Sequence, residues 1–184
     1  MNAALAKCKL HLKRSALLLC LSLIIGVSLG AADLLLSPRI LANREAETTG
    51  QIPALVPGST HSRRQTSPAG DIHAAFNEAD ALQGWVLPVS GRGFAGPIEL
   101  LIGLTPARER VTGVYILAQS ETPGLGSRIT SPTWLNEFKT RPESGRYRLG
   151  RDIDGLSGAT ISSAAVVDAV NQALDTLANP QEAF

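Results

Sequence analysis

The sequence predicts an α+β protein: an N-terminal transmembrane helix, then one antiparallel-sheet domain that ends in a C-terminal helix. Three observations predict this fold. Residues 15–32 are uncharged and rich in Leu and Ile. Residues 71–118 alternate between short apolar runs and turn residues, which is typical of a strand meander. Residues 160–177 place apolar side chains at helical spacing with polar residues between them.

The uncharged N-terminal run is long enough to cross most of a bilayer. Residues 15–32 would form about 27 Å of helix, against about 30 Å for the hydrocarbon core. Its basic flank lies wholly before it, and such flanks stay in the cytoplasm. We therefore expect a cytoplasmic segment at 1–14 and a single-pass signal-anchor at 15–36, with the remaining chain exported. A cleaved signal peptide fits almost as well, because Gly30-Ala31-Ala32 offers small residues for a peptidase.

The segment 37–70 is rich in Pro, Gly, Ser and Thr, so we expect a linker there. We expect it to be an irregular connection from Arg44 to Gly70 and partly helical around Pro38 to Ala46. The folded domain should then occupy residues 71–184. Its expected strands are 71–76, 82–89, 98–104 and 111–118, each with apolar or β-branched residues and each followed by a turn. A short helix is expected where Pro132 follows Ser131.

Charge and cysteine content exclude two classes of function. The chain beyond residue 32 carries more acidic than basic residues and no basic cluster, so we expect no nucleic-acid partner. Cys8 and Cys20 lie in or beside the apolar run, far from any His or acid cluster, which argues against a metal site or a disulfide framework.

The glycine cluster at residues 90–97 has the composition of a phosphate-binding loop. Such a loop should open a helix, whereas here an apolar strand follows at Ile98. We interpret the cluster as a tight connection between strands, and therefore as scaffold.

Two motifs carry the candidate chemistry. The loop Glu121-Thr122-Pro123-Gly124-Leu125-Gly126 combines a fixed φ at Pro123 with two permissive glycines, so Leu125 is held on a stiff turn. The run Asp154-Gly155-Leu156-Ser157-Gly158-Ala159-Thr160 leads straight into the amphipathic helix.

Thr160 therefore lies at or just before a helix N-terminus, where free N–H groups and the helix dipole favour an anion such as phosphate. An ordinary N-cap is the competing interpretation, and Ser157, Thr160, Ser162 and Ser163 are all candidates for it. If Thr160 carries a ligand, we expect Ser157 or Ser162 to cap the helix instead.

Both motifs resemble those of the FMN-binding domain family, and their order and spacing are similar to the G subunit of the Rnf (Rsx) electron-transport complex. The resemblance implies FMN held covalently by a phosphoester to Thr160. It also implies cofactor-binding roles for the neighbouring motif residues: Ser157, Gly158, Ala159, Asp154, Glu121, Thr122, Gly124 and Leu125. The chain departs from the family at Gln119-Ser120, where members often have His.

The same resemblance implies a function. The chain would be an electron-relay subunit, without a substrate of its own, in a bacterial inner-membrane translocase that couples electron transfer between ferredoxin and NAD to ion translocation. Its partners would be the other Rnf subunits and a periplasmic flavin transferase, and its main domain would be periplasmic. Three alternatives remain: the C subunit of the sodium-translocating NADH:quinone reductase, a stand-alone exported FMN-binding protein, and a flavin-free interaction module.

Overall fold

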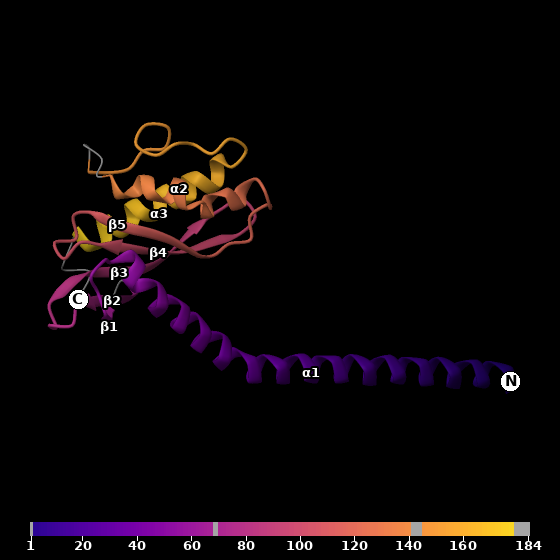
Figure 1. The fold of residues 1–184 in the computed structure, drawn as a ribbon. Helices are drawn as coiled ribbons and strands as arrows, with labels where there is room; N and C mark the ends of the chain where they lie inside the picture. The colour runs from indigo at the N-terminus through magenta and orange to yellow at the C-terminus, as the bar shows by residue number, and fades with distance from the viewer. Residues whose placement is uncertain (1, 68–69, 141–144, 179–184) are drawn as a thin grey trace. The chain divides into compact units, whose positions relative to one another are not determined.

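The computed structural model describes residues 2–67, 70–140 and 145–178, and it describes the side chains of residues 15–66, 70–140 and 145–176. The chain divides into two compact units between residues 46 and 47. Its elements are α1 (Asn2–Leu55), β1 (His61–Ser67), β2 (Gly70–Phe76), β3 (Leu82–Arg92), β4 (Pro97–Leu104), β5 (Val111–Ala118), the 3₁₀ helix η1 (Gly126–Thr130), α2 (Pro132–Leu135), the 3₁₀ helix η2 (Asn136–Lys139) and α3 (Thr160–Ala178). Figure 1 labels the α-helices and the strands.

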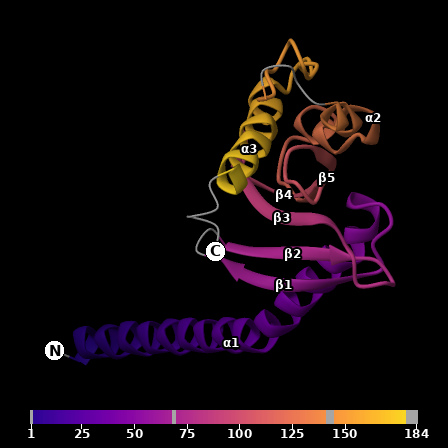
Figure 2. The same ribbon diagram turned by 90° about the vertical axis from the view of Figure 1, so that its left-hand side faces the viewer.

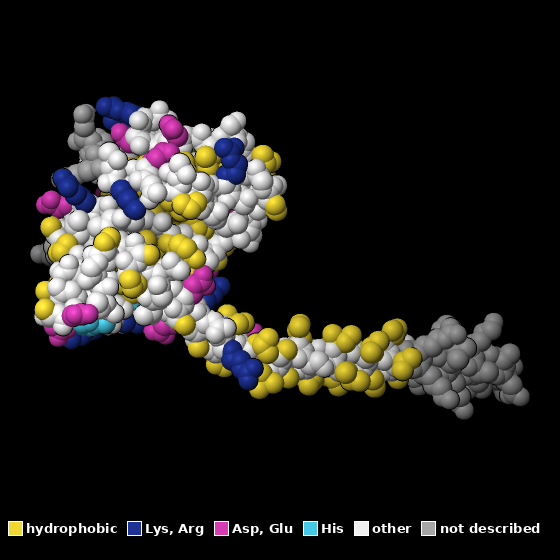
Figure 3. Space-filling view, viewed as in Figure 1, with side chains coloured by type: hydrophobic (Ala, Val, Ile, Leu, Met, Phe, Trp, Pro, Cys, Tyr) yellow, Lys and Arg dark blue, Asp and Glu magenta, His cyan; other side chains and the backbone are white. Residues whose placement is uncertain are grey.

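The first unit consists of the N-terminal part of α1. By length and composition, the helix from Ser15 can cross a membrane, since its most apolar 18-residue window has a mean hydropathy of 2.3 and none of that window is buried. Figure 3 shows the apolar side chains covering this part of the helix. The predicted membrane span therefore coincides with a continuous helix.

The second unit is built on a five-stranded antiparallel meander in the order β1-β2-β3-β4-β5 (Figure 2). The longest ladder pairs β3 with β4, from Trp85 opposite Leu104 to Arg92 opposite Pro97. The four predicted strands and the amphipathic C-terminal helix are confirmed, and β1 adds a fifth strand at the edge of the sheet.

The expectation of an irregular connection at residues 44–70 is wrong. Helix α1 continues to Leu55 and β1 begins at His61. Ile52, Leu55 and Val56 are buried against one face of the sheet, on a cluster that contains Ala75, Val86 and Leu101. The burial of these apolar side chains stabilises the helix end by more than Gly50 and Pro53 weaken it. This stabilisation comes from strands that are distant in sequence.

Two glycines allow this close approach. A Cβ on Gly103 would lie 2.7 Å from the Leu55 carbonyl oxygen, and one on Gly113 would lie 3.1 Å from Leu55 Cδ2. The Thr112 hydroxyl also donates a hydrogen bond to the Leu55 carbonyl, at 2.6 Å. The end of α1 is thereby attached to β4 and β5.

Helix α3 covers the opposite face of the sheet, as Figure 2 shows. Val166 and Val170 are fully buried in the main core, together with Ile98 and Ile102 of β4. A Cβ on Gly91 would lie 2.6 Å from the Ala165 carbonyl, so β3 and α3 approach closely at this glycine. This contact determines where the first turn of α3 lies relative to the β3–β4 loop.

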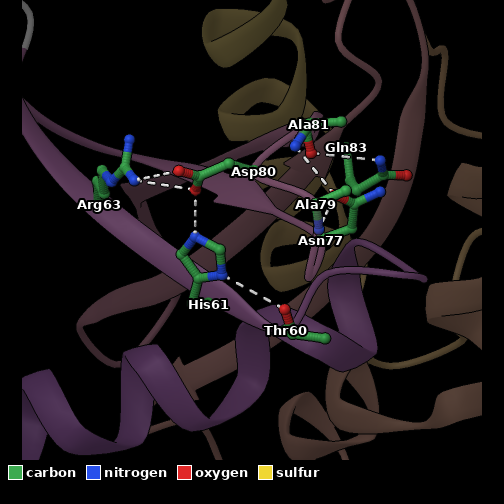
Figure 4. Close-up of polar contacts among 8 residues, drawn as sticks. All are labelled: Thr60, His61, Arg63, Asn77, Ala79, Asp80, Ala81 and Gln83. Atoms are coloured by element: carbon green, nitrogen blue, oxygen red, sulfur yellow. Dashed lines mark hydrogen bonds and ion pairs between the residues drawn. The ribbon is translucent and has the colours of Figure 1, made fainter.

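A polar cluster, drawn in Figure 4, holds the edge strand to the β2–β3 turn. The Asp80 carboxylate pairs with His61 Nε2 at 2.8 Å and accepts two bonds of 2.9 Å from Arg63. Asp80 adopts a left-handed φ of 59°, which Asp tolerates better than most residues. Asn77 Oδ1 closes the same turn by accepting the N–H groups of Ala79 and Ala81.

We predict that Asp80→Asn weakens the attachment of β1 at neutral pH. Hydrogen bonds from His61 and Arg63 lower the pKa of Asp80 from its ordinary value, and the bond from His61 has the larger effect. A lowered carboxyl pKa stabilises the fold above its unfolded pKa, and this contribution is lost as the pH falls through the folded pKa. Amide hydrogen exchange should therefore become faster in β1 and not in β4, and the difference should vanish in acid.

The matched control is Asp168→Asn, which changes an exposed carboxylate on α3. It should leave β1 exchange unchanged. Equal β1 protection in wild type and Asp80→Asn at neutral pH would contradict the prediction.

Candidate functional site

The two sequence motifs meet at one cavity of about 440 Å³. Three segments that are distant in sequence line it: the β3–β4 loop, the loop after β5, and the start of α3. The lining residues are Phe94, Glu121, Thr122, Leu125, Gly126, Gly158, Ala159, Thr160, Ile161 and Ser162.

Each of the three segments contributes one exposed apolar side chain to the cavity. Phe94 is 71% exposed, Leu125 49% and Ile161 55%. Leu125 also lies against the second motif, since a Cβ on Gly158 would be 3.1 Å from Leu125 Cδ2. Exposed large apolar side chains gathered around a hollow are typical of a ligand site, because a bound apolar group would remove them from water.

Three side chains from the preceding helices form hydrogen bonds with the backbone of the Asp154–Thr160 run. Trp134 Nε1 donates to the Asp154 carbonyl at 2.7 Å, and the Asp154 N–H donates to Glu137 Oε2 at 2.7 Å. Arg128 Nη1 donates to the Ser157 carbonyl at 3.2 Å. A turn then closes from the Ala159 N–H to the Leu156 carbonyl, with Gly158 at a φ of 78° that favours glycine. These contacts determine the position of Thr160.

The prediction that Ser157 or Ser162 caps α3 is wrong, because Ala159 occupies the N-cap position. The Ser162 hydroxyl instead donates to Glu121 Oε2, and the Ser163 hydroxyl donates to the Ala159 carbonyl at 2.9 Å. The first intrahelical bond runs from the Ser163 N–H to that same carbonyl. The N–H groups of residues 160–162 therefore precede the helical hydrogen-bond ladder, beside the exposed Thr160.

Glu121 is the one predicted residue that is a buried acid, with 5% of its surface exposed. Its Oε1 accepts the Ala95 N–H at 3.0 Å, and its Oε2 accepts the Ser162 hydroxyl. Burial acts to raise the pKa of Glu121, but the Ser162 hydroxyl and the backbone N–H groups of the β3–β4 loop outweigh it, so the pKa lies below its ordinary value. Glu121 is thus an ionised carboxylate in the cavity wall.

Two glycines make room for this carboxylate. A Cβ on Gly93 would lie 2.4 Å from Glu121 Oε1, and one on Gly126 would lie 2.7 Å from Glu121 Cβ and 2.8 Å from Oε2. The glycine cluster at residues 90–97 thus makes room for the Glu121 carboxylate and supplies the Ala95 N–H to it, and its Phe94 also lines the cavity, which the interpretation of the cluster as scaffold alone did not include.

The structure brings most of the predicted site residues together. Glu121, Thr122, Leu125, Gly158, Ala159 and Thr160 line the cavity. Three others do not line it. Gly124 shapes the loop with a φ of 75° and donates its N–H to Ser127 Oγ, while Asp154 and Ser157 lie in the run that leads to Thr160, with exposed side chains.

Sequence reasoning missed four lining residues: Phe94, Gly126, Ile161 and Ser162. Gly126 belongs to the first motif, and Ile161 and Ser162 directly follow the second, so adjacency could have indicated them. Phe94 carried no such signal. Within the described parts of the chain, no three His, Cys, Asp or Glu side chains converge to hold a metal ion.

Gln119, which stands where members of the family often have His, forms a hydrogen bond with the backbone of Glu121. Gln119 Oε1 accepts the Glu121 N–H at 2.6 Å. The side chain at this position thus orients the backbone that carries Glu121.

Comparison with known proteins matches residues 93–175 to the FMN-binding domain family. The G subunit of the ion-translocating oxidoreductase complex of Pseudomonas aeruginosa is 32% identical over 185 residues, covering 88% of this chain and 86% of the relative. The corresponding protein of Methanosarcina acetivorans is 40% identical over 94 residues, but the match spans half of that relative.

The chain is also similar to C subunits of Na(+)-translocating NADH-quinone reductases. The C subunit of the Na(+)-translocating NADH-quinone reductase of Chlamydia pneumoniae is 30% identical over 142 residues, covering 61% of this chain and 43% of the relative. Among solved structures, Shewanella oneidensis NqrC aligns with a TM-score of 0.49 and 25% identity. The alignment covers 62% of this chain and 63% of the NqrC chain.

The residues around the cavity are chemically suited to FMN. The apolar side chains of Phe94, Leu125 and Ile161 offer contact to a flat aromatic ring. The exposed Thr160 hydroxyl and the first N–H groups of α3 suit a phosphoryl group.

We predict that Gly126→Ala destabilises the domain by about 1–3 kcal/mol, because the new methyl group would overlap the buried Glu121 side chain. Guanidinium unfolding followed by Trp fluorescence measures this, since Trp85 and Trp134 are both buried. The matched control is Gly155→Ala in the second motif, where a Cβ meets no atom within 4 Å. Equal unfolding midpoints for the two variants would contradict the prediction.

Proposed function

The chain belongs to the family of G subunits of ion-translocating oxidoreductase complexes, and from this premise we propose that it carries FMN as a phosphoester on Thr160 and relays electrons within such a complex. The family and the FMN-binding domain support an electron-transfer role. The covalent attachment and the electron donors and acceptors are the proposal.

The accessibility of hydroxyl groups in the first turn of α3 carries the proposal. Ser162 and Ser163 are buried, at 2% and 0% exposure, and each donates its hydroxyl to an oxygen of the protein. Thr160 is exposed and lines the cavity. Of the three hydroxyls in this turn, that of Thr160 is therefore the one open to an incoming phosphoryl group.

The chain's own residues would each contribute to holding the flavin. The N–H groups at the start of α3 and the helix dipole would stabilise the charge of a phosphoryl group on Thr160. Phe94, Leu125 and Ile161 would cover apolar ring surface and exclude water from it. The redox chemistry is that of the flavin when bound. A covalent bond would prevent loss of the cofactor by diffusion outside the cytoplasm.

The location and partners follow from the same proposal. The N-terminal helix would anchor the protein in the inner membrane, with residues 1–14 cytoplasmic and the cavity-bearing domain periplasmic. A periplasmic flavin transferase would transfer the FMN part of FAD to the Thr160 oxygen, breaking the pyrophosphate bond, with AMP as the leaving group. The other proteins of the complex would exchange electrons between ferredoxin and NAD. The match over most of the Pseudomonas aeruginosa relative favours this complex over the sodium-translocating NADH:quinone reductase.

We predict that Thr160→Ala abolishes covalent flavin, because the variant lacks the oxygen that forms the ester. The protein would be produced together with a flavin transferase. Intact mass should then show one FMN, less one water, on the wild type and none on the variant, and the variant should lose in-gel fluorescence under denaturing conditions. Ser157→Ala, which removes an exposed hydroxyl in the same motif, should retain the flavin. A fluorescent Thr160→Ala band would refute the attachment site.

We predict that a membrane-impermeant maleimide labels Thr133→Cys in intact spheroplasts. Thr133 is exposed on α2, so its replacement should be reachable from the periplasm. The wild-type chain is the control, since its cysteines lie at position 8, on the proposed cytoplasmic side, and position 20, within the apolar run. Labelling of Thr133→Cys only after lysis would show that the domain lies on the cytoplasmic side, opposite to the proposed orientation. N-terminal sequencing of the mature protein would reveal a cleaved leader.

A further inference from the structure

Glu121 carries the sole ionisable side chain among the described residues that line the cavity. Resting on the proposed function, we propose that the Glu121 carboxylate is a fixed negative charge that lowers the reduction potential of the bound flavin. Glu121 thereby acts as a determinant of the electron-transfer step, in addition to its part in the fold.

The position of this charge is fixed by contacts from two other segments. Oε1 is held by the Ala95 N–H of the β3–β4 loop, and Oε2 by the Ser162 hydroxyl of α3. Gly93 and Gly126 pack so closely against the side chain that a Cβ on either would overlap it. The carboxylate therefore has little freedom to turn away from a ligand, so its effect on that ligand does not average out.

The surroundings of Glu121 allow its charge to act strongly. Only 5% of the residue is exposed, and the side chains that share the cavity wall are apolar or neutral. Because little of the Glu121 surface reaches water, the solvent screens its charge less than it screens a fully exposed charge.

Other charges near the cavity lie in solvent. Arg92 at the end of β3, Arg128 on η1 and Asp154 before the second motif all have side chains that reach water. Water and salt screen these groups. The hydrogen-bond donors to Glu121 favour its ionised form but do not neutralise its negative charge. Glu121 is therefore the charge that acts on a group inside the cavity.

The consequence for electron transfer follows from charge alone. Reduction adds an electron, and therefore negative charge, to a ring that occupies the cavity. A carboxylate in the cavity wall opposes that change, and an uncharged amide of the same shape does not. We expect Glu121→Gln to shift the equilibrium constant for one-electron reduction towards the reduced form by on the order of tenfold.

The experiment is a redox titration of the full-length, FMN-loaded protein in detergent, with dithionite as reductant and mediator dyes. Intact mass is measured first, to establish that wild type and variant each carry one FMN. The matched variant is Ser162→Ala, which removes a donor to the carboxylate and leaves its charge in place. The potential should rise in Glu121→Gln, whereas in Ser162→Ala it should stay unchanged or fall.

Three outcomes would overturn the proposal. The first is an unchanged potential in loaded Glu121→Gln, and the second is an equal rise in both variants, which would indicate a loosened site. The third is a folded Glu121→Gln that takes up no FMN, because Glu121 would then be needed to form the site and not to set its potential. A wild type without FMN would instead refute the proposed function.

Discussion

One buried carboxylate holds together three parts of the chain that are distant in sequence. Glu121, in the loop after β5, accepts bonds from Ala95 in the β3–β4 loop and from Ser162 in α3. A charge without partners is costly to bury, so the donors and the acid must be present together. Because Phe94, Leu125 and Ile161 each lie close in sequence to one of these bonded groups, the contact that satisfies the charge also arranges the walls of the cavity.

The glycines of the site follow from this contact. Gly93 and Gly126 lie where a Cβ would overlap the Glu121 side chain, so both loops must have a bare backbone there. The glycine cluster between β3 and β4 looks like a phosphate-binding loop, but it supports a protein carboxylate instead. The positive end available to a phosphate in this fold is at the start of α3, where the chain meets the same cavity.

The sequence was informative where the determining interactions are local. Strands β2 to β5 and helix α3 have clear periodicity, and the two motifs are short and contiguous, so both could be predicted. Strand β1 was missed because it is an exposed, polar edge strand, with no apolar face to produce alternation. The extension of α1 to Leu55 depends on burial against Ala75, Val86 and Leu101, and the Ser162–Glu121 bond joins residues 41 positions apart. Local patterns carry no record of such contacts.

The start of α3 lacks the side chain that usually stabilises such a position. Ala159 at the N-cap has no oxygen to accept a helix N–H, and relative to Ser, Thr, Asp or Asn this typically costs about 0.5–2 kcal/mol. The nearby hydroxyls do not take the place of a cap, because Ser162 bonds to Glu121 and Ser163 to the Ala159 carbonyl, and neither bond satisfies a free N–H of the first turn. A phosphoryl group on Thr160 would supply acceptors and negative charge where both are lacking. The uncapped helix start therefore supports attachment at Thr160 on energetic grounds that are independent of the motif.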